Sequence, residues 1–462
     1  MTEGNSGQPP ADRTPSRATV LSGLDRVREA ARRDPTLRFT CLLHHVNLSL
    51  LWDAYHALKH GAAPGVDGET WASYGEGDLE ARLADLHARL HRGSYRAMPS
   101  KRAWIPKGDG RMRPLGIAAL EDKIVQQAVA WVLGAIYEAD FLGVSYGFRP
   151  GRRQHDALDA LWVALTERKV NWVLDADIRS FFDRIVHERL IELVERRIGD
   201  RRVVRLLRKW LRAGVLEDGS WSATTEGTPQ GAVISPLLAN IYLHYVLDQW
   251  VMEWRRTQAR GEVYLVRYAD DFVMGFQHRD DAERLLADLR DRFAAYGLDL
   301  HQEKTRLFEF GRFAAANRAR RGQGKPETFD FLGFTHLCGR TRTAGRYTVW
   351  RQTIAQRLRK KVQEVKAWLM AHRHDPVPVV GAWLRSVVQG YFHYHAVPCN
   401  GAALLTFGSE VSRAWLHALR RRSQKGRHLT WERAKRLFQT WLPSPRILHP
   451  YPGVRFHARH PR

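Results

Sequence analysis

The sequence has few cysteines, no long apolar run and a shortage of acidic residues. Its three cysteines, Cys41, Cys338 and Cys399, lie far apart, so we expect neither a disulfide framework nor a paired-cysteine zinc module. The polar N-terminal residues lack the apolar segment of a signal peptide, and no apolar stretch is long enough to span a bilayer. We therefore expect a cytoplasmic protein that has no membrane partner.

What the sequence does contain is enough apolar residues for a core and an excess of cations. Hydrophobic residues make up 44% of the chain, which excludes an intrinsically disordered protein. The length of 462 residues predicts more than one domain. The formal net charge is +24, and most of it lies in residues 341–462, which hold 23 Lys and Arg but only four Asp and Glu. This imbalance favours a polyanionic partner, first of all nucleic acid, over a surface that is charged only for solubility.

Hydrophobic periodicity and turn residues predict a mixture of helices and strands. Residues 1–20 are expected to be disordered, residues 311–325 to form a basic loop, and the chain to be mainly helical from 352 and irregular from 443. Helices are predicted within 37–90 (with a loop at 61–68), 121–137, 185–198, 236–250 and 282–296, strands at 172–177, 263–268 and 272–276, and a hairpin at 101–117.

Two acidic strand ends are the most informative feature of the pattern. Asp270 and Asp271 are neighbours at the tip of an apolar hairpin, where two anions are costly without a cation. Asp175 and Asp177 end another apolar strand and share one of its faces, so spacing alone does not choose between them. Carboxylate oxygens suit Mg²⁺, and two such strand ends could hold the metal pair used for phosphoryl transfer. The alternative for the Asp-Asp pair alone is a solvated turn.

Residues 268–272 (YADDF) resemble the YADD box of reverse transcriptases. Further blocks follow the order of that family over about residues 37–340, and 63–68 and 350–442 resemble the N-terminal extension and the thumb of bacterial group II intron-encoded reverse transcriptase/maturases. These blocks are 105–107 with 113–117, 145–152 (SYGFRPGR), 177–183, 227–231 (GTPQG) with 235–240 (SPLLAN), 297–298 with 303–305, and 331–334 (FLGF).

The resemblance implies an α+β right-hand polymerase. Its fingers and palm, with an antiparallel sheet, would precede an α-helical thumb or maturase domain. The expected divisions are a disordered tail over 1–20, fingers and palm with the N-terminal extension over 21–340, the thumb over 341–445 and a basic tail over 446–462. The paired cysteines of the endonuclease domain found in many relatives are missing, so no such domain is expected.

The resemblance also implies the site. Asp177, Asp270 and Asp271 would be the catalytic, metal-binding carboxylates, the backbone carbonyl of Ile178 would add a ligand, and Asp175 would be only a strand neighbour. The implied cofactor is Mg²⁺.

Four residues are implied to bind the incoming nucleotide. Lys107 and Arg113 would hold its triphosphate, and Gln230 would line its pocket. Phe182 would act as a steric gate against a ribose 2′-OH. The residues expected to bind nucleic acid are Arg111, Lys304, Arg318, Arg320, Arg321, Lys360, Lys361, Arg420, Arg421 and Arg422.

The implied function is RNA-directed DNA synthesis from dNTPs and a DNA or RNA primer on an RNA template. Binding of group II intron RNA would promote splicing and mobility into a DNA target, in the bacterial cytosol or nucleoid. Two alternatives stay open: a domesticated reverse transcriptase in defence or repair, and an RNA-binding splicing factor that does not require polymerase activity.

Overall fold

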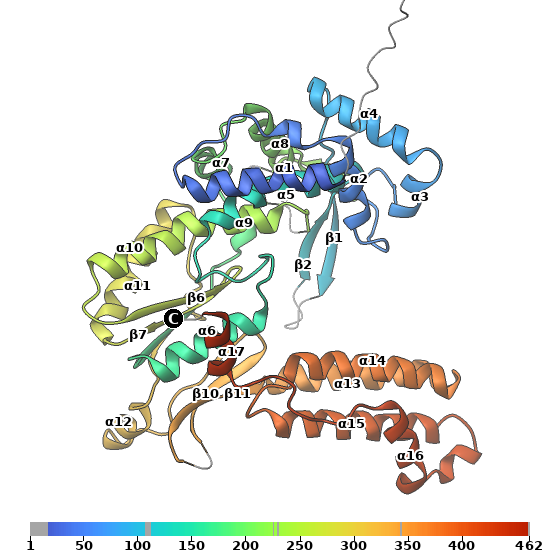
Figure 1. The fold of residues 1–462 in the computed structure, drawn as a ribbon. Helices are drawn as coiled ribbons and strands as arrows, with labels where there is room; N and C mark the ends of the chain where they lie inside the picture. Colours follow the sequence, from blue (N-terminus) through green and yellow to red (C-terminus); the bar gives the residue numbers. More distant parts are fainter. Residues whose placement is uncertain (1–16, 107–111, 225, 229–230, 342–343, 461–462) are drawn as a thin grey trace, which may run out of the picture. The chain divides into compact units, whose positions relative to one another are not determined.

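The computed structural model describes residues 17–106, 112–224, 226–228, 231–341 and 344–460 (Figure 1). The chain forms two compact units, each assembled from three stretches of sequence. The first unit comprises Met1–Gly151, Asp177–Glu253 and Ala287–His301, and the second comprises Arg152–Ala176, Trp254–Leu286 and Gln302–Arg462. Helices and antiparallel strands occur in both, so the predicted α+β class is confirmed. The domain boundaries drawn from the sequence stay predictions.

The first unit is mostly helical. Its longest helix, α5, is apolar on nearly every face and lies buried, as its sequence predicts. The hairpin β1–β2 is extended by β4, which runs parallel to β1, and by β5. The elements are α1 (Arg17–Arg33), α2 (Leu48–Ala57), α3 (Trp71–Gly75), α4 (Leu79–Arg92), β1 (Ser100–Pro106), β2 (Met112–Ile117), α5 (Leu120–Asp140), α7 (His187–Glu195), α8 (Arg201–Arg212), β4 (Val215–Glu217), β5 (Ser220–Ser222) and α9 (Ser235–Leu243), with short 3-10 turns at Leu43–His45 and Phe181–Asp183.

The second unit contains two antiparallel sheets and a helical region. The strand orders are β6-β7-β3-β8 and β11-β10-β9. Helices α13 to α16 pack around a common apolar core that includes Leu384, Phe407 and Trp415. The elements are α6 (Gln154–Glu167), β3 (Trp172–Ala176), β6 (Val263–Tyr268), β7 (Asp271–Phe276), β8 (Arg306–Glu309), α12 (Ala314–Arg320), β9 (Phe329–Phe331), β10 (Phe334–Arg340), β11 (Tyr347–Thr353), α13 (Ala355–Ala371), α14 (Val377–His395), α15 (Gly401–Arg420), α16 (Trp431–Trp441) and α17 (Pro452–Arg459).

Two helices connect the stretches that are assigned to different units. A π-helical turn at His244–Asp248 continues α9 into α10 (Gln249–Thr257), so the helix predicted at 236–250 runs further than expected. Helix α11 (Arg279–Ala295) ends before Gly297, whose φ of 72° is the left-handed conformation in which glycine commonly terminates a helix. None of the helices in the described part of the chain combines the length and apolar character needed to cross a membrane.

Three segments predicted to be irregular contain helices. Residues 17–20 belong to α1, whereas residues 1–16 of the predicted disordered tail lie outside the described residues, and the basic segment 311–325 contains α12. The C-terminal segment contains α17, which packs on α6 (Figure 1). Arg455 pairs there with Asp159, and Arg459 with Asp156. Periodicity missed α12 and α17 because they are short and depend on such tertiary contacts for their stability.

Candidate active site

The turn between β6 and β7 carries the paired aspartates. Tyr268 pairs with Asp271 across the hairpin, so Ala269 and Asp270 form its tip, and Asp271, which was predicted at the tip, is the first residue of β7. The neighbouring Val266 and Phe272 are buried, whereas Asp270 is half-buried and Asp271 is exposed. Ala269 has a φ of 58°, a left-handed conformation that side chains other than Gly, Asn and Asp rarely adopt. The turn is therefore strained, and a strained turn must be stabilised by its surroundings.

Arg267 provides part of that stabilisation and was missed by the sequence analysis. Its side chain is completely buried, and Nη1 donates a 2.9 Å hydrogen bond to the carbonyl oxygen of Ala269. A guanidinium group in a protein core is expensive unless it is hydrogen-bonded, so this contact ties the conformation of the turn to the sheet. The available signal was one charged residue in an otherwise apolar strand, VYLVRY.

The other acidic strand end lies in register with this hairpin. Strand β3 pairs with β7 up to the pair Ala176 and Phe272; Asp177 directly follows Ala176, and Asp271 directly precedes Phe272. Asp175 pairs in register with Arg306 of β8, and their charged groups lie 3.4 Å apart. Asp175 thus has a cationic partner within the sheet, and its role as a strand neighbour stays a prediction.

The backbone that follows β3 is also fixed. Ile178 forms an antiparallel bridge with Leu300. The two hydrogen bonds of the bridge use flanking groups: Arg179 donates to the Asp299 carbonyl, and His301 donates to the Asp177 carbonyl. The bridge therefore occupies the carbonyl of Asp177 but leaves the carbonyl of Ile178 outside the hydrogen-bond pair.

The donor set suits a hard divalent cation. Asp177 and Asp270 are half-buried and Asp271 is exposed, so carboxylate oxygens are accessible at each of these positions. Among the residues that the structure describes, no group of three or more His, Cys, Asp or Glu side chains is already arranged as a metal site. The fit to a divalent metal therefore rests on two features: the donors are carboxylate oxygens, and the register of β3 with β7 aligns the strand ends that carry them.

Phe182 is held by the turn that contains the GTPQG motif. The carbonyl of Phe182 accepts a 2.8 Å hydrogen bond from the Thr228 amide. Gly227 has a φ of 84°, and a Cβ there would lie 2.9 Å from the same carbonyl, so only glycine fits. Arg113 is exposed on β2 opposite Ile105. Lys107, Arg111 and Gln230 lie outside the described residues.

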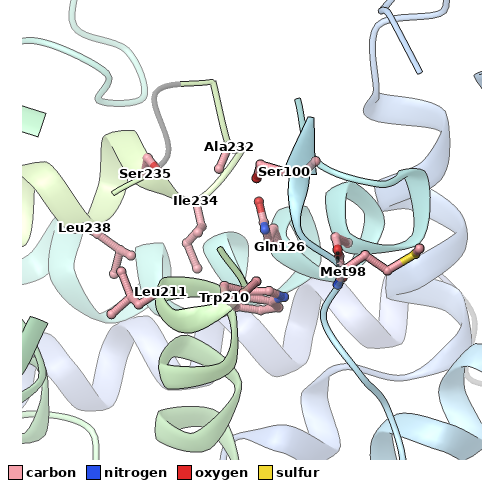
Figure 2. Close-up of a pocket in the computed structure, with 12 residues that line it drawn as sticks. Met98, Ser100, Gln126, Trp210, Leu211, Ala232, Ile234, Ser235 and Leu238 are labelled. Carbon is pink, nitrogen blue, oxygen red and sulfur yellow. Dashed lines mark hydrogen bonds between the residues drawn. The ribbon is translucent and has the colours of Figure 1, made fainter. Parts of the chain in front are cut away.

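A small pocket lies beside the segment that follows this turn (Figure 2). Ala232, Ile234 and Ser235 line one side of the pocket, opposite Ser100 and Gln126. Oε1 of Gln126 accepts a 3.1 Å hydrogen bond from the Val233 amide. Helix α5 thereby fixes the backbone just after the GTPQG motif.

A buried carboxyl group, that of Asp122, also lines this pocket. Asp122 accepts hydrogen bonds from the Tyr95 hydroxyl and the Met98 amide, and the Trp210 indole donates to Tyr95 at 2.9 Å. Burial raises the pKa of Asp122 to about 6, although both hydrogen bonds act in the opposite direction. The network joins α5 to α8 and to the start of β1.

The GFR segment of the second motif contributes mainly to the architecture. Arg149 is buried, pairs with Glu138 at 3.0 Å and donates to the carbonyls of Leu142 and Ser145. The Asn240 side chain donates to the Gly147 carbonyl at 2.8 Å. This hydrogen bond joins two motifs that lie far apart in the sequence.

The cations proposed to bind nucleic acid differ in how far they are already engaged. Arg318 pairs with Glu327 at 3.6 Å, Arg321 pairs with Glu309, and Arg320 donates to Asn317 at 2.6 Å. On the helical region, Arg420 and Arg422 donate to backbone carbonyls, and Lys361 pairs with Glu364. Lys304, Lys360 and Arg421 are exposed, and so are Arg320, Arg321 and Arg420 despite their contacts.

Comparison with known proteins identifies the family of the chain. Residues 105–336 match the family model described as reverse transcriptase (RNA-dependent DNA polymerase). The chain is 38% identical to "Protein YkfC" of Escherichia coli K12 over 282 residues, which are 53% of this chain and 72% of that protein. It is 41% identical to "Group II intron-encoded protein LtrA" of Lactococcus lactis subsp. cremoris over 179 residues, 38% of this chain and 29% of that protein.

A more distant relative is "Nuclear intron maturase 4, mitochondrial" of Arabidopsis thaliana, with 30% identity over 142 residues, 30% of this chain and 17% of that protein. The family match includes β3, β6, β7 and all three predicted catalytic aspartates. The chain therefore belongs to the reverse transcriptase family of RNA-dependent DNA polymerases, and its relatives include group II intron-encoded proteins.

Proposed function

We propose that Asp177, Asp270 and Asp271, with the Ile178 carbonyl, hold two Mg²⁺ ions at which the chain extends a primer on an RNA template. The observation that carries this proposal is the register of β3 with β7, which aligns the two acidic strand ends. The metal ions, when bound, would polarise the attacking hydroxyl and neutralise charge on the leaving group. The carboxylates position the ions, and Arg267 positions the turn that bears two of them.

In the proposed reaction the primer 3′-hydroxyl loses its proton to solvent, and its oxygen forms a bond to the α-phosphorus of a dNTP. The bond from that phosphorus to the bridging oxygen breaks, and pyrophosphate leaves with the electron pair. Lys107 and Arg113 would bind the triphosphate, Arg113 through a guanidinium fork suited to phosphate oxygens. Gln230 would line the nucleotide pocket. Phe182 would exclude a 2′-OH, and its fixed backbone supports a steric role.

We further propose that residues 341–445 act as the thumb of a right-hand polymerase. This region has a helical core of its own and carries Lys360, Lys361 and Arg420 to Arg422. Together with Arg111, Lys304, Arg318, Arg320 and Arg321, these cations would bind the nucleic-acid backbone, since phosphate contacts need charge rather than sequence.

The relatives named for introns motivate a second proposed role. This chain would bind group II intron RNA and promote its splicing, and would carry the intron to a DNA target. The chain's strong positive charge supports tight binding of a folded RNA. Splicing needs only RNA binding, so it should survive loss of the carboxylates.

The test is primer extension on an RNA template with dNTPs and Mg²⁺, comparing wild type with Asp270→Ala/Asp271→Ala. We expect extension to fall by at least about a thousandfold, because several kcal/mol of transition-state stabilisation is lost with the metals. RNA affinity should be retained. An active double variant would contradict the metal assignment. No extension by wild type, with tight RNA binding, would favour a splicing factor.

A further inference from the structure

Helix α8 concentrates positive charge in a part of the chain that is otherwise nearly balanced. Residues 195–212 contain eight Arg and Lys and two acidic residues, whereas residues 1–340 as a whole contain 50 and 45. The helix itself has no acidic residue. One face is buried through Val204, Leu207 and Trp210. The other presents an exposed stripe of Arg201, Arg205, Arg208 and Arg212 at intervals of three and four residues.

The start of this stripe lines a hollow of about 650 Å³ in the first unit. Arg201, Arg205 and Arg208 line it from α8, and Arg38 lines it from the segment after α1. Glu195 is the one acidic residue in the lining, and it pairs with Arg208 at 3.1 Å. The hollow therefore has cations on two of its sides and little negative charge.

Arg38 is held opposite α8 by the backbone. Phe39 bridges Ile198, donates to the Arg197 carbonyl at 2.8 Å and accepts from Gly199 at 2.7 Å. The amides of Leu42 and Leu43 donate to the Asp200 carboxylate at 2.7 and 3.0 Å. The two sides of the hollow are thus fixed relative to each other before any ligand binds.

Helix α8 is equally well anchored on its buried side. Trp210 reaches Asp122 through the Tyr95 hydroxyl, and Lys209 donates to the Tyr95 carbonyl. Burial lowers the pKa of Lys209, and the nearby Arg205 and Arg96 lower it further, which reports a positive local field. No ion pair engages Arg38, Arg201 or Arg205 among the described residues, so these three charges are available to a ligand.

We propose that this hollow, lined by Arg38, Arg201, Arg205 and Arg208, binds the phosphate backbone of a structured RNA. None of these four residues is among the positions already assigned to nucleotide or nucleic-acid binding. An α-helix rises 1.5 Å per residue, so the stripe offers a guanidinium about every 5–6 Å. Guanidinium groups bind phosphate oxygens in pairs, and cations on both sides suit a strand passing between them. The inference rests on the proposed RNA-binding function and assigns part of it to the first unit.

The test measures how the affinity for a folded RNA depends on salt, using the full-length chain and a group II intron transcript. In Arg38→Gln/Arg201→Gln/Arg205→Gln, three phosphate contacts are lost without breaking an ion pair. We expect affinity to fall about tenfold and the salt slope to decrease by roughly two to three. The control Arg255→Gln/Arg256→Gln/Arg290→Gln removes the same number of charges from α10 and α11. It should change the RNA affinity and the salt slope much less.

Two further arms identify the ligand and exclude misfolding. Glu195→Gln removes the only acid in the lining and should raise RNA affinity about twofold to fivefold, which an unfolded variant could not do. Duplex DNA of matched length should respond less to the triple variant than the folded RNA does. The triple variant and Glu195→Gln should both extend a short primer on an unstructured RNA template at the wild-type rate.

The outcomes separate this inference from the proposed function. If wild type binds the transcript and extends primers but the triple variant matches its control, only the α8 site is wrong. A larger effect on DNA than on RNA would also overturn it. If wild type does not bind the transcript, both the α8 site and the maturase proposal fail, whereas primer extension tests the polymerase separately.

Discussion

The β6–β7 turn and helix α8 use charge in opposite ways. At the turn, two carboxylates protrude from a sheet whose backbone is paired, and a buried arginine fixes their geometry. Along α8, arginines line a hollow, and a buried carboxylate fixes the helix from the other side. The turn suits a small, highly charged metal ion that demands exact oxygen positions. The helix suits an extended polyanion that needs charge at several points.

The comparison shows that one buried group of opposite sign supports each exposed set. Arg267 supports Asp270 and Asp271, and Asp122 supports α8 through Tyr95 and Trp210. Buried charges of this kind need hydrogen bonds to be tolerated, and in return they specify one geometry. Variants that lack these supporting side chains test this relation, and so do variants of α12, another arginine-rich helix.

The largest effect is expected for the support of α8. The pKa of Asp122 is raised by burial to about 6, so the folded chain binds this proton more tightly than the unfolded chain does. Stability from Asp122 is therefore present below pH 4 and is lost as the pH rises to about 6, by about 3 kcal/mol. Asp122→Asn should remove this dependence, as measured by urea unfolding between pH 4 and pH 7. An unchanged pH profile would contradict the assignment.

The support of the turn is expected to have a smaller effect, on catalysis. Arg267→Lys keeps the charge but loses the guanidinium that holds the Ala269 carbonyl. We expect primer extension to slow about tenfold, since small displacements of metal ligands are costly. The Mg²⁺ concentration for half-maximal rate should rise, whereas primer–template affinity should not change. A lower melting temperature with unaltered Mg²⁺ dependence would show that Arg267 serves only the core.

The smallest effect is expected for α12, whose arginines already have partners. Arg318 and Arg321 pair with glutamates, and Arg320 is bound by Asn317. Arg318→Gln/Arg320→Gln/Arg321→Gln should weaken RNA binding by less than about threefold, because the existing ion pairs compete with phosphate. The expected loss of RNA affinity in Arg38→Gln/Arg201→Gln/Arg205→Gln, beside α8, is about tenfold. Equal losses would mean that the number of cations, not their arrangement, decides binding.

Much of the fold could be predicted because local sequence patterns determine many of its helices and strands. The hairpins at 101–117 and 263–276 and the buried helix after Leu120 follow from alternation, turn residues and apolar content. Helices α1, α12 and α17 were not predicted in the segments taken as disordered, loop or irregular. All three sequences are basic, α12 and α17 are also short, and α17 is held by partners about 300 residues away, such as Asp159.

Within the candidate site, the sequence predicted only residues that belong to recognisable motifs. The aspartates stand out because adjacent anions between apolar strands need an explanation. Arg267 and Asp122 did not stand out, since a single charge in an apolar segment does not reveal its partner. The surface of α8 was missed because its cations were averaged with the acidic residues elsewhere in residues 1–340, and only the fold brings Arg38 to them.

The most direct test of this account is one experiment on two variants. Asp270→Ala/Asp271→Ala and Arg38→Gln/Arg201→Gln/Arg205→Gln would each be measured for primer extension on a short unstructured RNA template and for binding of a folded intron RNA. We predict that the first variant loses extension and keeps binding, and that the second keeps extension and binds about tenfold more weakly. Loss of both activities in either variant would contradict the division of roles between the turn and α8.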